Sequence, residues 1–562
     1  MQSRLFLFVM NQLLSNAFAL ATRLNLARWI IAISALKIIL GIVTRFTGID
    51  VWDDALMFVR YADNFLAYGN VAWNPGGEAV YGTTSPLFLS VIILLRVAFG
   101  SNPLVILWFA SIIGGLGFIV LFASLSERHT QLEPSSRDWV GALVFFSLAA
   151  PNTMLIQHLT TGMDTTLTLV YLTGFVWLYK YHERTQSNAS ALATGLIAGL
   201  AFFCRPELLI FTFILPAFVA IGDPTPRARR NAWLILAIAA GAVASEMLIA
   251  QLILNSPLPL PFYAKGLKLY GDAIYLQYAG KNWNELKNFL SAYWYLFALI
   301  AADLVLNFKP WRTGRAAEKG MLLAVVVFIA YLTFLVLQIM GGAARFYLPV
   351  LPIILWLGSQ GLVALVQRVS RVPSARIRAG SWAIATFFAL IALAFLFRRA
   401  YWEVQWLGAR VPQPMFANFD AHRLVEIAWP RQLWYRLDEV ADLPDDLVIA
   451  ATEVGYLGAL NPGKPIVDLA GLNTADFARA PFAANVLFEK YNPDLIYLPH
   501  PHYVEMNPAI FDAPQFRQNY VYRHRDELGV WLDVAIRRDS KHVDALRRIL
   551  DKGKIASPVR TQ

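Results

Sequence analysis

Long apolar segments alternate with short polar stretches over roughly the first 400 residues of the chain. A helix needs about 20 residues to cross a hydrocarbon core of roughly 30 Å, and most of these segments approach that length. The pattern therefore predicts an α-helical polytopic membrane protein. The apolar segments cover residues 28–47, 86–99, 103–124, 139–156, 165–181, 191–203, 207–222, 232–254, 288–307, 320–340, 346–366 and 379–397.

The segment 86–99 is the weakest of these candidates, because it is short, contains Arg96 and ends in a Gly-Ser-Asn-Pro stretch. The loop charges indicate whether it crosses. Suppose that segment 86–99 does not cross and lies on, or dips into, the outer face. The fifteen Lys and Arg residues of five later loops then fall on one side of the membrane, and the loops on the opposite side contain few Lys or Arg residues. Cytoplasmic loops carry the excess of Lys and Arg, so this arrangement is favoured. It predicts about 11 transmembrane helices plus one re-entrant or juxtamembrane segment.

The same rule gives the orientation of the chain. Residues 1–27 are expected to be a cytoplasmic segment, and the transmembrane domain covers 28–397, with 48–102 as its first outer loop. Residues 398–562 are then expected outside the membrane, which in a bacterium means the periplasmic or outer face of the inner (plasma) membrane. The pair 191–203 and 207–222 is short and interrupted by Cys204-Arg205-Pro206-Glu207, so a hairpin that reaches only the outer leaflet stays an alternative for that pair.

The pattern changes after residue 397, where short strand-like runs alternate with helical stretches. This alternation is typical of an α/β domain, and we place it at 398–540 with a polar tail at 541–562. The expected strands lie at 447–451, 465–469, 494–498 and 529–534.

Composition and charge support the membrane interpretation. Of the 562 residues, 57% are hydrophobic and only 15% are charged, against about 25% in ordinary soluble domains. The net charge is +10, but residues 1–397 carry +11 and residues 398–562 carry −1. The basic excess thus belongs to the membrane part, which argues against nucleic-acid binding. Cys204 is the only cysteine, so an intrachain disulfide and a cysteine-based zinc site are excluded.

The first outer loop holds the densest group of chemically active side chains. Asp53 and Asp54 directly follow the first spanning segment. A carboxylate at the membrane surface can take a proton from a sugar hydroxyl; the alternative is that these two only cap a surface helix. Further side chains of the loop offer hydrogen-bond donors and a surface on which a sugar can stack. These are Arg60, Tyr61, Trp73, Asn74, Tyr81 and Thr83.

The loop also resembles a known family. Its motifs are similar to the first outer loop of the GT-C superfamily of glycosyltransferases, and most of all to the terminal arabinofuranosyltransferase family. Weaker matches follow in the same order over about residues 50–530. The first-loop motifs are Asp53-Asp54-Ala55, Arg60-Tyr61-Ala62, Trp73-Asn74-Pro75-Gly76 and Tyr81-Gly82-Thr83-Thr84-Ser85-Pro86. The later ones are Thr161-Gly162-Met163-Asp164, Arg205-Pro206-Glu207, Tyr263-Ala264-Lys265, Arg345-Phe346-Tyr347-Leu348-Pro349 and Val467-Asp468-Leu469-Ala470-Gly471-Leu472-Asn473.

The resemblance implies an enzyme that passes a sugar, arabinofuranose in the named family, from a polyprenyl-phosphate carrier to a cell-envelope polysaccharide or glycolipid. No cofactor is certain, and a divalent cation stays open. The resemblance makes Asp53 the first candidate for the catalytic base and Asp54 the second. Asp164 stands where the family more often has Glu, and Tyr263 belongs to the Tyr-Ala-Lys motif; we add both to the substrate-binding candidates, with His158 at an outer helix end.

The topology adds an independent argument for the donor phosphate. Arg205, Lys265 and Arg345 all fall at the outer face, at the depth where a polyprenyl phosphate carries its anion. Arginine matches an oxyanion with two parallel hydrogen bonds. The alternative is that each cation only reaches the lipid headgroups. Because all three lie within family-like motifs, we favour phosphate binding.

Two other functions remain as alternatives: a lipid-carrier flippase or transporter, and a non-catalytic envelope-assembly protein that binds glycan. A transporter favours inverted repeats, and the sequence has no visible repeat. We predict no metal site. His500-Pro501-His502 could hold a metal, but we interpret it as a loop after the strand at 494–498, because no nearby carboxylate cluster supports a metal site.

Overall fold

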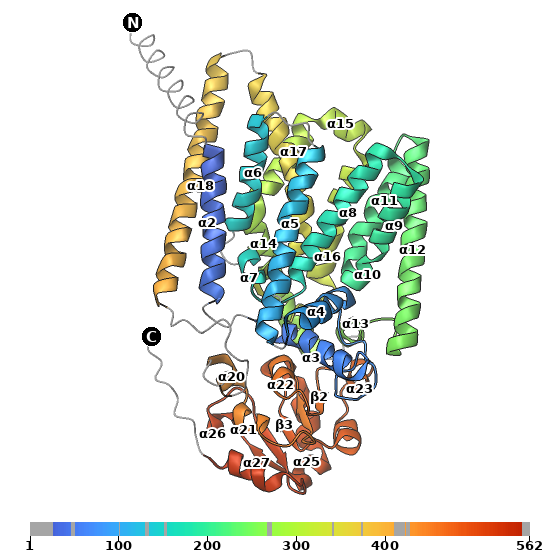
Figure 1. Cartoon of the computed structure of the whole chain (residues 1–562), viewed down its shortest axis with the longest axis vertical. Helices are drawn as coiled ribbons and strands as arrows, with labels where there is room; N and C mark the ends of the chain where they lie inside the picture. Colours follow the sequence, from blue (N-terminus) through green and yellow to red (C-terminus); the bar gives the residue numbers. More distant parts are fainter. Residues whose placement is uncertain are drawn as a thin grey trace.

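A bundle of long helices makes up most of the molecule, and a smaller α/β domain lies at one end of it (Figure 1). The computed structural model describes residues 26–46, 51–100, 102–129, 134–150, 154–266, 272–339, 342–371, 375–409, 422 and 428–552. The N-terminal segment expected at 1–27 lies outside these residues except for its last two.

Each apolar segment of the sequence coincides with one or more helices. Among the described residues, seven helices are long and apolar enough to span a membrane: Leu26–Thr44, Pro103–Ser126, Pro226–Leu254, Ala279–Leu306, Ala316–Phe334, Gly342–Val369 and Ala383–Gln405. Four of the eleven expected spans are shorter or more polar, so that count stays a prediction. The helices of the bundle are α2 (Leu26–Phe46), α5 (Pro103–His129), α6 (Pro134–Ala149), α7 (Met154–His158), α8 (Thr165–Thr185), α9 (Asn188–Gly199), α10 (Ala201–Cys204), α11 (Leu209–Gly222), α12 (Pro226–Leu254), α14 (Asp272–Leu306), α15 (Phe308–Thr313), α16 (Ala316–Phe334), α17 (Leu351–Ser370) and α18 (Ala375–Ala409).

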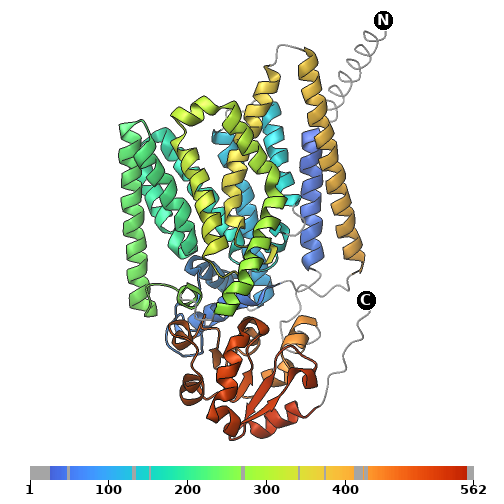
Figure 2. The same ribbon diagram turned by 180° about the vertical axis from the view of Figure 1, so that it is seen from behind.

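Three short helices lie at the end of the bundle that faces the C-terminal domain: α3 (Asp53–Tyr68), α4 (Pro86–Phe99) and α13 (Leu260–Gly266). Both views place α3 and α4 between the bundle and that domain (Figure 1 and Figure 2). The hydroxyl of Ser85 accepts the N–H of Phe88, and Pro86 begins α4. With 14 residues at about 1.5 Å each, α4 is too short to cross a bilayer.

The C-terminal domain is built on a five-stranded mixed sheet, in the order β2-β1-β3-β5-β4. Strand β1 pairs in parallel with β2 and β3, whereas β5 is antiparallel to β3 and β4. The strands are β1 (Ile449–Ala451), β2 (Ile466–Asp468), β3 (Leu495–Tyr497), β4 (Tyr520–Arg523) and β5 (Val534–Arg537). The helices are α20 (Ala428–Leu433), α21 (Leu437–Ala441), α22 (Gly455–Leu460), α23 (Ala475–Ala478), α24 (Asn507–Asp512), α25 (Pro514–Asn519), α26 (Arg525–Leu528) and α27 (Val543–Leu550), with a π-helical turn η4 (Val486–Tyr491) and a 3-10 segment η5 (Pro501–Met506).

The expected fold class, a polytopic helical membrane protein with a C-terminal α/β domain, is confirmed, but three details of the domain are corrected. Helix α18 continues to residue 409, past the expected boundary at 398. The strand expected at 529–534 begins only at Val534, because residues 525–533 form a short helix and a turn, and β4 was not expected. Helix α27 begins in the expected polar tail, where the side chains of Leu546, Ile549 and Leu550 are buried.

Candidate active site

A cavity of about 970 Å³ lies at the junction of the bundle, the short helices α3 and α13, and the C-terminal domain. Five polar side chains expected from the sequence line it, and Leu472 reaches it from the C-terminal domain. The five are Asp54, Thr83, Arg205, Lys265 and Arg345. Much of the remaining wall is apolar, including Phe202, Leu209, Ile210, Val327, Phe334 and Leu335. Such a cavity suits a molecule with an apolar chain and an anionic head.

The two arginines reach the cavity from irregular stretches of the chain, and the lysine reaches it from a short helix. Arg205 has an extended backbone (φ −165°, ψ 126°) between α10 and the 3-10 turn η1 (Pro206–Leu208), since Pro206 prevents the helix from continuing. Arg345 lies between the turns η2 (Gly342–Ala344) and η3 (Leu348–Val350). Lys265 belongs to α13, and burial lowers its pKa, against the opposing charge of Asp54.

The two arginines share their neighbours. Each guanidinium carbon lies 5.4 Å from the centre of the Phe346 ring. The carboxylate of Asp164 lies between them, with Oδ1 at 3.8 Å from Nη1 of Arg205 and 3.5 Å from Nη2 of Arg345. Arg205 also pairs with Glu207. Asp164 is thus placed to hold the arginines together.

These contacts leave donors of both arginines unused. Within the part of the chain that the structure describes, Nε and Nη1 of Arg205 and Nε of Arg345 are buried and have no hydrogen-bond acceptor. Buried donors are normally satisfied, and unsatisfied ones need an explanation. An anion bound between the two guanidinium groups would supply the acceptors.

The two aspartates of the first loop have different surroundings. Asp54 lines the cavity, with Oδ2 at 3.3 Å from Nη1 of Arg345. Asp53 is buried, and its carboxylate accepts the backbone N–H groups of Gly455 (2.8 Å) and Tyr456 (2.7 Å) in the C-terminal domain. Burial raises the pKa of Asp53 to about 7, and the charge of Asp54 adds to this rise. Asp53, the first candidate from the sequence, therefore contacts the other domain, and Asp54 faces the cavity.

Four further candidates from the first loop bind the C-terminal domain as well. The guanidinium of Arg60 donates to the carbonyl groups of Trp73, Gly458, Asn461 and Lys464 at 2.7–2.9 Å. The indole N–H of Trp73 donates to Ile466 O, and the Asn74 side chain accepts the N–H of Ile466. The Tyr61 hydroxyl donates to Asn473 Oδ1 at 2.9 Å. The expected sugar-stacking surface is therefore corrected, because the Trp73 residue is only 1% exposed and lies inside this contact.

The remaining candidates lie near the cavity but not in its wall. His158 is buried, with Nε2 3.3 Å from Ala343 O and its ring against Trp52. Tyr81 is buried in the first loop. The Tyr263 ring lies 5.7 Å from the guanidinium of Arg479 on the C-terminal domain. These three side chains are therefore not among the residues that line the cavity.

Glu453 and Asp468 were not expected at the site from the sequence, and the fold brings both beside the first loop. Glu453 follows β1 and Asp468 ends β2. Burial raises the pKa of both carboxyl groups, that of Asp468 to about 7; for Glu453 the charges of Asp53 and Asp54 add to the rise. The signal was present in the run 452–458, which follows a predicted strand, and in the family-like motif at 467–473, which overlaps the next one.

Comparison with known proteins supports the architecture. Residues 422–543 match the profile of a family described as a domain of unknown function (DUF8728). No curated protein matches the sequence. ArnT from Cupriavidus metallidurans bound to undecaprenyl phosphate has 12% identity and a TM-score of 0.52, covering 91% of this chain and 98% of its own. The apo form of ArnT has 13% identity and a TM-score of 0.51, with the same coverage of the two chains. The apo oligosaccharyltransferase of Archaeoglobus fulgidus has 13% identity and a TM-score of 0.47, covering 84% of this chain and 69% of its own. The chain therefore has the GT-C type of fold that ArnT has.

Proposed function

We propose that the chain is a multi-pass membrane glycosyltransferase that transfers a sugar from a polyprenyl-phosphate donor to a cell-envelope glycan or glycolipid. One observation carries the proposal: Arg205, Lys265, Arg345 and Asp54 line the same largely apolar cavity. The apolar wall suits the polyprenyl chain, and the cations suit its phosphate. ArnT, whose fold this chain has, was solved with undecaprenyl phosphate bound.

The chemistry follows from charge development. The acceptor hydroxyl oxygen attacks the anomeric carbon of the donor sugar and gives its proton to a carboxylate. The bond from that carbon to the phosphate oxygen breaks, and its electron pair leaves with the polyprenyl phosphate. Arg205, Lys265 and Arg345 stabilise the growing negative charge on the phosphate, which is where preorganised cations lower a barrier most.

Asp54 is the proposed base. Its carboxylate lines the cavity, whereas both oxygens of Asp53 accept backbone N–H groups of the other domain. The ion pair with Nη1 of Arg345, at 3.3 Å, orients the Asp54 carboxylate in the cavity wall. Asp53 is then a positioning residue, since it orients the first turn of α3 that carries Asp54.

The remaining features of the proposal concern location and substrate. The loop charges favour an inner-membrane protein whose C-terminal domain lies outside the cytoplasm, where the domain would contact the acceptor. The sequence resemblance favours arabinofuranose as the sugar. In that arrangement the cavity lies at the outer face of the membrane.

The test is release of polyprenyl phosphate by the purified protein in detergent. The donors are polyprenyl-phosphoryl arabinofuranose, mannose and glucose, each with a mixed glycan acceptor. Asp54→Asn is compared with Asp63→Asn, a carboxylate on the same helix that pairs with Arg96 outside the cavity. We expect release from one donor, a loss of about 100-fold or more in Asp54→Asn, and near-normal release in Asp63→Asn.

Other outcomes separate the alternatives. Equal release by Asp54→Asn and the unmodified protein would refute Asp54 as the base. No release from any donor, together with movement of the labelled lipid across vesicles, would support a flippase. Glycan binding without release or movement would support an assembly protein.

A further inference from the structure

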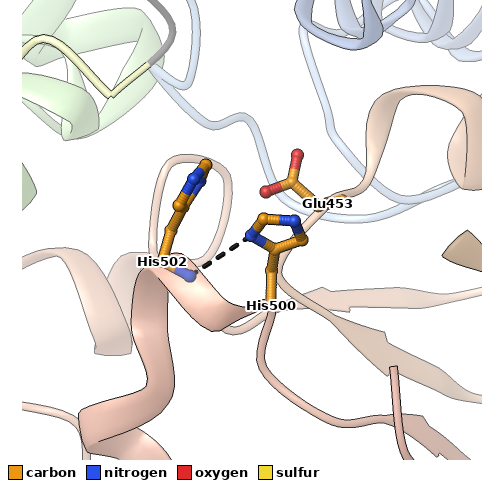
Figure 3. A group of neighbouring side chains, drawn as sticks. All are labelled: Glu453, His500 and His502. Carbon is orange, nitrogen blue, oxygen red and sulfur yellow. Dashed lines mark hydrogen bonds between the residues drawn. The ribbon is translucent and has the colours of Figure 1, made fainter. Parts of the chain in front are cut away.

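Three side chains of the C-terminal domain converge at one edge of its sheet. Glu453 follows β1, and His500 and His502 follow β3 (Figure 3). Strands β1 and β3 are parallel neighbours, so the segments after them leave the sheet on the same side. Each side chain offers one ligand atom, and the three atoms lie within 4.8 Å of one another. The sequence alone pointed to a plain loop at the two histidines, because Glu453 is far from them along the chain.

The backbone fixes the positions of these side chains. The N–H of His500 donates to the Thr452 hydroxyl at 3.0 Å, which ties the β3 loop to the residue before Glu453. The N–H of His502 donates to Nδ1 of His500 at 3.2 Å, and the N–H of Tyr503 donates to His500 O at 2.7 Å. The two imidazole rings lie 4.3 Å apart at 63°. Backbone hydrogen bonds therefore fix the loop that carries His500 and His502 next to the segment that carries Glu453.

The charges around Glu453 call for a cation. Glu453 is only 9% exposed, and the carboxylates of Asp53, Asp54 and Asp468 act on it electrostatically, against the opposing charge of Lys265. Collecting carboxylates in a low-dielectric region is costly unless positive charge compensates them. Two imidazoles and one carboxylate, with a fourth position open, are a ligand set that suits Zn²⁺, whereas Mg²⁺ and Ca²⁺ prefer oxygen ligands alone.

We propose that Glu453, His500 and His502 bind a zinc ion at the face of the C-terminal domain that borders the cavity. The ion would connect the segment after β1 to the loop after β3. The segment after β1 also carries Gly455 and Tyr456, whose N–H groups hold Asp53. Zinc would therefore stiffen the contact that orients the first turn of α3, and it would offset the acidic charge around Glu453.

The experiment measures metal binding directly and does not depend on the enzymatic reaction. Full-length protein without a histidine tag is purified in detergent, treated with chelator and titrated with Zn²⁺ against a chromophoric chelator. Metal content is then measured by mass spectrometry. Glu453→Gln, His500→Ala and His502→Ala are compared with His524→Ala. His524 is an exposed histidine of the same domain that lies near the carboxylates of Asp526 and Asp533.

We expect one zinc per chain for the unmodified protein and for His524→Ala. Loss of an outer-shell group typically weakens a metal site by about 10–100-fold, so loss of a ligand should cost about 100-fold or more. Zinc should also raise the midpoint of thermal unfolding of the unmodified protein, but not that of the three ligand variants. His500→Cys, which keeps a zinc ligand, should retain binding and so separate loss of the ligand from a folding defect.

Three results would overturn the proposal. The first is no zinc above background in the unmodified protein. The second is binding that persists unchanged in all three ligand variants, because zinc would then sit elsewhere. The third is equal loss of zinc in His500→Ala and His500→Cys when both remain folded by gel filtration.

Discussion

The backbone N–H of Gly455 donates to Asp53 Oδ2 at 2.8 Å, and the two residues approach so closely that a Cβ on Gly455 would lie 1.8 Å from Asp53 O. Only glycine allows this approach, because such a distance is far inside van der Waals contact. The N-terminus of α22 therefore rests directly on the first turn of α3. This contact joins the C-terminal domain to the segment that carries Asp54, the cavity-lining carboxylate.

Replacing Gly455 with alanine should separate these two elements. The added methyl group must displace either α22 or Asp53, and overpacking of this kind typically costs about 1–3 kcal/mol. We expect a lower midpoint of thermal unfolding in detergent and a loss of transfer activity. Gly241→Ala is the control, because its added Cβ would meet open space among the described neighbours of α12. Unchanged stability and activity in Gly455→Ala would show that the contact is not tight in solution.

Arg345 should contribute to phosphate binding because it lines the cavity. Its Nε is buried and donates to no acceptor in the part of the chain that the structure describes. In Arg345→Gln the charge is lost, and a hydrogen bond to a charged group is worth about 1.5–3 kcal/mol. We therefore expect the affinity for undecaprenyl phosphate to fall by about 10–100-fold, measured by native mass spectrometry or by thermal shift.

Two further variants make this measurement specific. Arg345→Lys keeps the charge but not the planar fork, so it should bind with intermediate affinity. Arg229→Gln removes an exposed arginine at the start of α12 and should bind like the unmodified protein. If Arg345→Gln also bound normally, Arg345 would serve only to pair Asp54 and Asp164.

The sequence predicted the bundle well because a spanning helix leaves a long apolar run that needs no knowledge of its neighbours. It was less informative for the sheet. Strand β4 contains Arg523 and is mostly half-buried, so its apolar signal is weak. Helix α27 lies in a polar stretch and packs mainly through Leu546, Ile549 and Leu550. In both cases the packing partner decides the structure.

The site shows the same division. Arg205, Lys265 and Arg345 could be predicted because charged residues in apolar surroundings at one membrane face are conspicuous. The order of Asp53 and Asp54 could not. Consecutive helical residues point about 100° apart, and the side facing the C-terminal domain is set by Gly455 and Tyr456, about 400 residues later in the chain. The approach of Glu453 to the two histidines could not be predicted either, because it depends on the pairing of β1 with β3.

Arg60 should act on stability rather than on sugar binding. Its guanidinium donates to four backbone carbonyl groups and lies over the Trp73 ring at 4.8 Å. Lysine keeps the charge but cannot reach all of these acceptors, and each buried acceptor left alone costs about 1–3 kcal/mol. We expect Arg60→Lys to lower the free energy of unfolding by about 3 kcal/mol, with little change in KM for the donor in the protein that remains folded.

The contrasting result for Arg60 is equally clear. If Arg60 and Trp73 bound the sugar, Arg60→Lys would raise KM and leave the unfolding midpoint unchanged. Arg399→Lys, a substitution in α18 at the far side of the bundle from α12 in Figure 1, controls for a general effect of replacing arginine with lysine.

Asp468 should make the folded chain less stable as the pH rises. Its carboxylate accepts hydrogen bonds from Ala470 and Asn473, but burial dominates and raises its pKa from the ordinary 3.8 to about 7. Between about pH 4 and 7 the folded chain therefore holds this proton more tightly than the unfolded chain, so the free energy of unfolding falls with rising pH and levels off above 7. One pKa unit corresponds to about 1.4 kcal/mol, which puts the contribution at about 4 kcal/mol at most.

The variant Asp468→Asn should flatten the slope of the free energy of unfolding against pH. The flattening should be partial, because the raised pKa of Asp53 acts in the same direction. Urea unfolding followed across this pH range would show it, and Asp526→Asn, an exposed carboxylate of the same domain, should leave the slope unchanged. A slope that is the same in Asp468→Asn and the unmodified protein would mean that Asp468 stays ionised in the folded chain.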